Sequence, residues 1–317
     1  MLAYVLRRLL ATIPVLLLTS IIVFLLMHLL PGDPIVLLVG QAQADVSAQT
    51  LAKLRHEYGL DLPIWGQYLA WLGQCLSGNL GRSIQNNQAV WQVIAPRILP
   101  TVQIGITAWL LAVIIAVPVG AITARIPGSW QDWLATVVSL AGAAMPYFLT
   151  GGVLIYLLAL HWRLLPASGY VPLTQHPWAS ICSTIMPALT LSLGFAAVLA
   201  RQSRASFMEV LHLAYIRTAR AKGLTEGRVV GYHAACNALL PIITVLGLQV
   251  STLFSGAVVT ETVFAIPGIG RLLVDSILGR DYPVVQGVVL FIAVTVIAAN
   301  LFVDVLYGVL DPRLREA

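Results

Sequence analysis

The segment from Arg217 to Glu226 carries the densest polar chemistry of the chain. It reads Arg-Thr-Ala-Arg-Ala-Lys-Gly-Leu-Thr-Glu, which places three cations within six residues. A structured basic segment between two long apolar runs suits docking into a groove on a partner protein. The alternative is an ordinary solvated loop that carries the positive charge of the cytoplasmic side. The residues of this docking segment are Arg217, Thr218, Ala219, Arg220, Ala221, Lys222, Gly223, Leu224, Thr225 and Glu226.

A glycine divides the docking segment into two helical parts. Alanines favour a helix over 205–222, and Gly223 can adopt the positive φ that stops it. Thr225 is then placed to cap a second short helix over about 226–237. Pro241 is expected to begin the apolar helix that follows. The sequence therefore predicts a helix, a tight glycine turn and a short helix, all held off the membrane.

No nucleotide-binding or catalytic pattern accompanies this segment. A phosphate-binding loop needs Gly-Lys-Ser/Thr, but the two lysines, Lys53 and Lys222, both follow alanine. No Ser-His-Asp set and no pair of carboxylates is legible either. We therefore expect no enzyme activity and no bound cofactor in this chain. Any pumping must then be driven by energy that another protein delivers.

The cysteines and histidines do not form a metal site. Cys75, Cys182 and Cys236 lack the spacing of metal ligands, and the six histidines are scattered along the chain. We expect free thiols, with a Cys75–Cys182 disulfide as the alternative. The net charge of +5 belongs to basic inner loops and does not indicate nucleic-acid binding.

Composition places most of the chain in lipid. Of the 317 residues, 59% are hydrophobic and only 10% are charged, and the mean hydropathy is +0.88. A soluble domain carries about 25% charged residues. Each apolar run is near the length of about 20 residues that crosses a bilayer as a helix. The sequence thus predicts an all-α protein with six transmembrane helices, at Leu9–Leu30, Thr101–Ala124, Leu134–Leu160, Thr184–Ala200, Leu239–Thr260 and Val284–Val303.

Positive charge orients these helices. Arginines flank the runs at Arg7, Arg125 and Arg313, and the loop 201–240 is the most basic of all. These segments share one side of a six-span protein, which is the cytoplasm by the positive-inside rule. We therefore expect a multi-pass protein of a bacterial inner membrane with both termini in the cytoplasm.

The long connection after the first run lies on the opposite side. Helical spacing over Leu51–Tyr58 and Trp65–Leu76 predicts an extracytoplasmic helical insertion between the first two spans. Its aromatic residues suit either interfacial anchoring or substrate contact. The predicted division is an N-terminal segment with the first span at 1–30, the insertion at 31–100, and a core domain at 101–317.

The apolar runs contain no Asp, Glu, Lys or Arg, which argues against a proton-driven carrier. The fifth run has the densest mild polarity, so Gln249, Ser251, Thr252 and Ser255 are candidates for lining a transport path. The alternative for them is hydrogen bonding between helices. Glu261 follows this run and is a candidate outer gate. Its alternative is a solvated charge or a charge at a helix end.

The docking segment with its flanks resembles the cytoplasmic loop of binding-protein-dependent ABC importer permeases, in the version of dipeptide, oligopeptide and nickel transporters. The matching residues are Tyr215–Leu224 and Asn237–Pro241. The resemblance extends over essentially the whole chain and is to the first permease of such systems. Further matching motifs are Leu6-Arg7-Arg8, Pro31-Gly32-Asp33-Pro34, Tyr58-Gly59-Leu60-Asp61, Asn79-Leu80-Gly81-Arg82-Ser83, Leu165-Pro166-Ala167-Ser168-Gly169-Tyr170, Ile266-Pro267-Gly268-Ile269-Gly270-Arg271, Asp281-Tyr282-Pro283 and Asp311-Pro312-Arg313.

The resemblance implies a membrane subunit that forms half of a translocation path. It implies four kinds of neighbour: a second, related permease in a heterodimer, two ATPase subunits, a substrate-binding protein outside, and lipid. Peptides are the expected substrate, and nickel or a nickel chelate is the alternative. A channel or secondary carrier that works without ATP is the remaining possibility.

Overall fold

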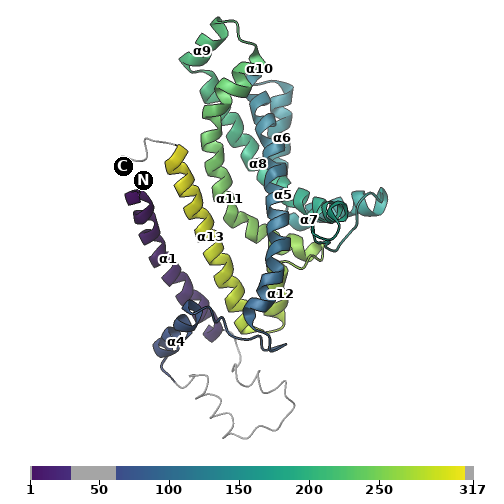
Figure 1. Ribbon diagram of the computed structural model, residues 1–317. Coiled ribbons are helices and arrows are strands. Elements are labelled where there is room, and N and C mark those ends of the chain that lie inside the picture. The colour runs from purple at the N-terminus through teal and green to yellow at the C-terminus, as the bar shows by residue number, and fades with distance from the viewer. Residues whose placement is uncertain (1, 30–61, 311–317) are drawn as a thin grey trace, which may run out of the picture. The chain divides into compact units, whose positions relative to one another are not determined.

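The computed structural model describes residues 2–29 and 62–310. Within these ranges the chain is helical, with one isolated antiparallel bridge between Arg82 and Ala89, so the all-α prediction is confirmed (Figure 1). The helices are α1 (Leu2–Leu29), α4 (Ile64–Leu76), α5 (Val90–Arg125), α6 (Trp130–Ala144), α7 (Tyr147–Leu154), η1 (Ile155–His161), α8 (Pro177–Leu211), α9 (Ala214–Ala221), α10 (Glu226–Arg228), η2 (Val229–Ala234), α11 (Ala235–Val263), α12 (Ile269–Leu278) and α13 (Tyr282–Leu310).

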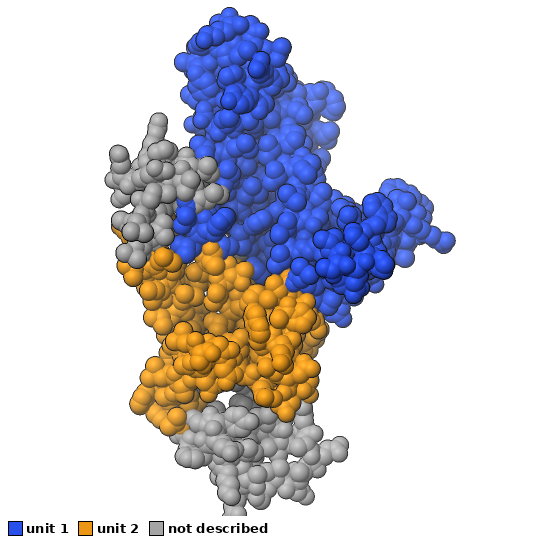
Figure 2. All heavy atoms as spheres, viewed as in Figure 1, with its two compact units in different colours: residues 1, 99–271, 299–317 blue, residues 2–98, 272–298 orange. Residues whose placement is uncertain are grey.

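The chain forms two compact units, coloured separately in Figure 2. One unit comprises residues 99–271 and 299–317 together with residue 1, and the other comprises 2–98 and 272–298. Residues 31–61 of the insertion predicted at 31–100, which include the predicted helix Leu51–Tyr58, lie outside the described residues. The predicted division of the chain therefore stays a prediction.

Among the described residues, five helices are long and apolar enough to cross a membrane. They lie in α1, α5, α8, the run from α10 into α11, and α13. The number is six if the bent pair of α6 and the continuous α7–η1 segment is counted as one span, with its bend of 107° at the break. The predicted run Leu134–Leu160 is thus sharply bent, and α7 crosses the direction of α6 in Figure 1.

The bend is set by a proline and held by an aromatic ring. Pro146 precedes α7 in an extended conformation and cannot donate a hydrogen bond to the turn before it. Tyr147 then packs between α8 and α11, where glycines face its ring. A Cβ at Gly194 would lie 3.1 Å from the ring, and one at Gly256 would lie 3.0 Å from it. These two glycines therefore make room for the ring that fixes the bend.

Small residues let α5 approach α8 closely. Ile104, Ala108, Ala112 and Ala116 are each at most 1% exposed and recur every four residues, which places them on one helix face. Gly120 continues this face, and a Cβ there would lie 2.4 Å from the Cβ of Ser203 on α8. Small residues at such spacing stabilise membrane helices through close packing. Around α8 this packing builds the core of the first unit.

The second unit confirms a helix close to the predicted Trp65–Leu76 stretch. Tyr68 on this helix, α4, contacts α1, because its hydroxyl lies 2.8 Å from Ser20 Oγ and its ring lies 5.5 Å from the ring of Phe24. Trp65, which the sequence places on the same stripe as Tyr68, is instead exposed. In the same unit, Ser83 Oγ donates to the buried carboxylate of Asp281, which ties the turn before α5 to the start of α13.

Candidate functional site

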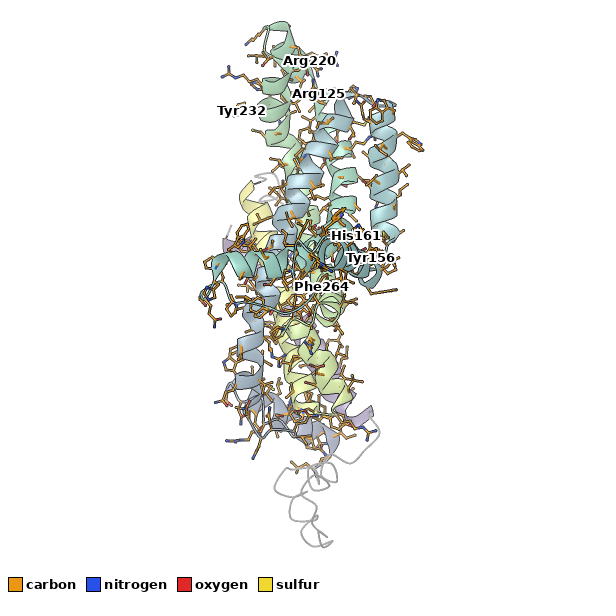
Figure 3. The ribbon with its side chains drawn as sticks, turned by 90° about the vertical axis from the view of Figure 1, so that its right-hand side faces the viewer. Arg125, Tyr156, His161, Arg220, Tyr232 and Phe264 are labelled. Atoms are coloured by element: carbon orange, nitrogen blue, oxygen red, sulfur yellow. The ribbon has the colours of Figure 1, made fainter. Side chains whose placement is uncertain are left out.

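The first half of the docking segment forms a separate short helix. The sequence predicts one helix over 205–222, and this is wrong, because α8 ends at Leu211 and α9 begins at Ala214. Leu213 between them is extended, with φ −70° and ψ 150°. In Figures 1 and 3 the helix α9 lies beyond the ends of α5, α6 and α8, and Arg220 lies near its tip. The break gives the chain a projecting arm.

The second half of the docking segment continues directly into a transmembrane helix. Gly223 has φ +78° and makes the predicted turn, and Thr225 occupies the predicted N-cap position. From Glu226 the helix then runs through α10, η2 and α11 to Val263 without interruption. The prediction of a separate short helix that ends near residue 237 is therefore wrong. Pro241 lies inside α11, where it removes one hydrogen bond without ending the helix.

One face of α9 packs on this long helix. Ile216 is 0% exposed and Ala219 is 8% exposed, and both belong to the apolar core that includes Val229, Val230 and Ala234. Full burial of a side chain such as Ile216 contributes about 2 kcal/mol. The other face is open to solvent and presents Arg217, Thr218, Arg220, Ala221 and Lys222. The docking residues thus divide into an inner pair and an outer, basic surface.

Polar contacts brace α9 at both ends. Across the glycine turn, Arg220 Nε donates to Glu226 Oε1 at 2.7 Å, and both side chains are about two-fifths exposed. At the other end, the hydroxyl of Tyr215 donates to the carbonyl of His233 at 3.2 Å and accepts from Asn237 Nδ2 at 2.8 Å. Tyr215 and Asn237 belong to the matching motifs, but only the structure shows that they meet.

A further pair joins α6 and α8 near the base of the arm. Asp132 on α6 pairs with Arg204 on α8 at 2.5 Å, and the Asp132 carboxylate also accepts from Gly128 N at 2.9 Å. Ser129 caps the start of α6. Sequence reasoning did not single out Asp132. The signal that points to it is Ser129 at an N-cap with an acidic residue three positions later.

The candidate path residues fall on different faces of α11. Thr252 and Ser255 are exposed, and Leu248 lies on the same stripe. Gln249 is buried and its Nε2 donates to the carbonyl of Phe195 on α8 at 3.3 Å, which is a bond between helices. The side chain of Ser251 lies outside the described residues. Thr252 and Ser255 are therefore the members of the set that lie open to the surroundings of this chain.

Glu261 lies in a buried network at the end of α11. It is 0% exposed, so the alternative of a solvated charge is wrong, whereas its position near the end of α11 agrees with the alternative of a charge at a helix end. Its carboxylate accepts from Thr101 Oγ1 at 2.5 Å and from the backbone N–H of Arg271 at 3.0 Å. Thr101 Oγ1 in turn accepts from the N–H of Ile269 at 2.8 Å. Glu261 thus holds the first turn of α12 against the start of the membrane part of α5, and its gating role stays a prediction.

Comparison with known proteins gives matches over nearly the whole chain. Residues 116–316 match the family "Binding-protein-dependent transport system inner membrane component", and residues 1–105 match the N-terminal family "Binding-prot-dependent transport system membrane comp, N-term". The dipeptide transport system permease protein DppB of Escherichia coli is 42% identical over an alignment of 339 residues, which covers 100% of this chain and 99% of DppB.

Two other relatives also match this chain over nearly its whole length. The glutathione transport system permease protein GsiC of Escherichia coli is 41% identical, and the probable peptide ABC transporter permease protein y4tP of Sinorhizobium fredii is 39% identical. Each alignment covers at least 98% of this chain and 99% of the relative.

The inward-facing MetNI methionine ABC transporter is similar in fold. The TM-score is 0.58 at 15% identity, and the match covers 69% of this chain and 97% of that chain. The chain belongs to the family of inner membrane components of binding-protein-dependent transport systems.

Proposed function

We propose that this chain is the permease subunit of an ATP-driven importer for di- or oligopeptides. The observation that carries the proposal is the arm, in which a basic outer surface on α9 is joined through one glycine turn to a transmembrane helix. Relatives named for dipeptide, glutathione and peptide transport align with the chain from end to end. These relatives match the chain in length and at this level of identity, which supports the role of a permease subunit for this chain as well.

In this proposal the exposed face of α9 enters a groove on a cytoplasmic ATPase subunit. Two such ATPases hold the ATP and Mg, a second permease completes the path, and a substrate-binding protein delivers the peptide outside. The termini lie in the cytoplasm with α9. Near-complete switching between inward and outward access needs about 5.5 kcal/mol of differential affinity, which ATP binding to the ATPases supplies.

The path-lining role follows from the open stripe on α11. Thr252 and Ser255 present hydroxyl groups from a helix that begins at the arm, so a displacement of α9 reaches the residues that meet the substrate. Mild polarity without charge suits a path that a peptide backbone crosses without tight binding. The second permease, packed against this stripe, encloses the path.

The test is uptake in cells that carry the transporter with wild-type or altered chain. Ala219→Glu places a charge in the packed inner face of α9, whereas the control Tyr232→Glu places the same charge at an exposed position of η2, outside the docking segment. We expect dipeptide uptake to fail in Ala219→Glu because the arm detaches, with wild-type amounts of the chain in the membrane. Uptake of Ni²⁺ but not of dipeptides by the wild-type cells, with its loss in the variant, would contradict the peptide assignment.

A further inference from the structure

The long helix behind the arm has a weak section close to the point where α9 acts on it. Between Glu226 and Ala234 the helix contains Gly227 and Gly231, and η2 has π-helical hydrogen bonding. Glycines reduce helix stability because the unfolded backbone has more freedom to lose. An isolated π-helical turn is less regular than an α-helix and is frequent at functional sites. A push delivered here bends the helix unless something spans the section.

The helix α9 spans this section, and its far end is held by Tyr215. The Tyr215 hydroxyl binds the carbonyl of His233, the penultimate residue of η2, and the side-chain amide of Asn237 in the first turn of α11. The apolar inner face of α9, Ile216 and Ala219, covers the same section from the side. At the other end of α9, Arg220 binds Glu226 at the start of the long helix. The two polar contacts thus bracket the glycine-containing section.

The other connection of α9 is different in kind. Toward α8 the chain passes through His212 and Leu213, where the helical hydrogen-bonding pattern stops and Leu213 is extended. Two residues outside a helix change φ and ψ more readily than a helix does. An α9 released from α11 would therefore turn at His212–Leu213, so its contacts with α11 are the ones that fix its position.

We propose that Tyr215 is a positioning residue that locks α9 to α11, so that a push on α9 reaches the long helix instead of turning α9 at His212–Leu213. The inference rests on the proposed function, because it describes how a movement of the ATPase is transmitted through α9 to the transport path. The lock itself is a property of this chain alone.

The experiment measures distances between spin labels in the full chain, purified in lipid without partners and again in the assembled transporter. One pair joins Arg217→Cys on α9 to Leu248→Cys on α11, and a second joins Arg217→Cys to Arg201→Cys on α8, all at exposed positions in a background without native cysteines. With Tyr215 present, we expect a narrow distribution of distances between the labels on α9 and α11. This distribution should stay the same when the assembled transporter is trapped with ATP. The α9–α8 distribution should be equally narrow, because α8 packs on α11.

Tyr215→Phe removes only the hydroxyl. Loss of its hydrogen bonds, if they are of ordinary strength, raises the population of molecules with a detached α9 about fivefold. We expect the α9–α11 distribution to broaden and the peptide transported per ATP hydrolysed to fall by about the same factor. Tyr232→Phe is the matched control, since Tyr232 lies exposed on η2. It should change neither quantity.

Gly231→Ala separates bracing from a direct contact of Tyr215 with a partner. A Cβ at Gly231 meets no atom within 4 Å, so alanine fits there and stiffens the helix. In the Tyr215→Phe background, we expect Gly231→Ala to narrow the distribution of α9–α11 label distances again. The peptide transported per ATP hydrolysed should partly recover. An unchanged distribution in Tyr215→Phe, or no recovery with Gly231→Ala, overturns the proposal. If the chain binds no ATPase, the proposed function fails, but the label distances without partners still decide whether the lock exists.

Discussion

The Arg204 guanidinium holds the Asp132 carboxylate at two points, with Nε at 2.5 Å from Oδ1 and Nη2 at 2.8 Å from Oδ2. Asp132 lies almost buried on α6, and Arg204 is about one-third exposed on α8. A paired guanidinium and carboxylate of this geometry fixes orientation as well as distance. The contact therefore makes α6 and α8 a single block at the base of the arm.

Removal of one partner should destabilise this block. We expect Asp132→Asn to lower the free energy of unfolding by about 1–3 kcal/mol, because it leaves the guanidinium without its charged partner. Thermal unfolding of the purified chain in detergent measures the change.

The exchange Asp132→Arg with Arg204→Asp is the control for this pair. It should recover part of the loss but not all of it, since the hydrogen bond from Gly128 N is not restored. A double variant less stable than the sum of the two single variants would show that the pair does not act through its charges.

Gly268 is predicted to tolerate no side chain. A Cβ there would lie 2.1 Å from Cδ and Oε1 of Glu261, so the buried carboxylate would have to leave its partners Thr101 and Arg271. We expect Gly268→Ala to destabilise the chain by about 1–3 kcal/mol, as overpacking commonly does. Gly152→Ala in α7 is the matched control, because no atom lies within 4 Å of its Cβ. Equal melting temperatures for the two variants would contradict the described position of Glu261.

The stripe on α11 makes a prediction that cysteine scanning can check. Cysteines at Leu248, Thr252 and Ser255 should react with a water-soluble thiol reagent in the assembled transporter, and transported peptide should protect them. Cysteines at Gln249 and Leu253, which are buried, should stay unreactive. If the exposed and the buried positions reacted equally, Leu248, Thr252 and Ser255 would not line the transport path.

Cys75 offers a pH test of the position of helix α4. All three cysteines are free, as expected from the sequence. Burial raises the pKa of the Cys75 thiol from 9.0 to about 11, because the charged thiolate is disfavoured in apolar surroundings. Thiolate is the reactive form, so at pH 8 the folded chain should react with maleimide about a hundredfold more slowly at Cys75 than the denatured chain.

The same shift sets the direction of the effect of pH on stability. The folded state holds the proton of Cys75 more tightly than the unfolded state does. This contribution to stability is complete below pH 9 and is lost as the pH rises toward 11. A single-cysteine variant that keeps Cys75 isolates the effect. Equal labelling rates for the folded and denatured chains would contradict the burial of this thiol.

The helices could be predicted from the sequence because lipid allows few alternatives. Each apolar run must satisfy its own backbone hydrogen bonds, so length and composition determine its type. The glycine turn at Gly223 was also predictable, since a positive φ favours this residue. Thr225 at the N-cap followed from local chemistry in the same way.

The site could not be predicted in full because its contacts join residues far apart in the sequence. The burial of Glu261 could not be predicted because its partner Thr101 lies 160 positions away. Asp132 had no visible role because Arg204 lies 72 positions away. The break before α9 and the continuity of the helix through Pro241 depend on packing that no local pattern records. Tertiary contacts thus decided the features that local propensity left open.

The most direct test is reconstitution of the chain in liposomes, with and without the ATPases, the second permease and the binding protein. We predict concentrative peptide uptake only with all components and ATP. We also predict that Arg217→Cys on α9 forms a crosslink to an ATPase subunit. Accumulation of peptide by this chain alone, or full uptake in a complex whose α9 contacts no ATPase, would contradict the account.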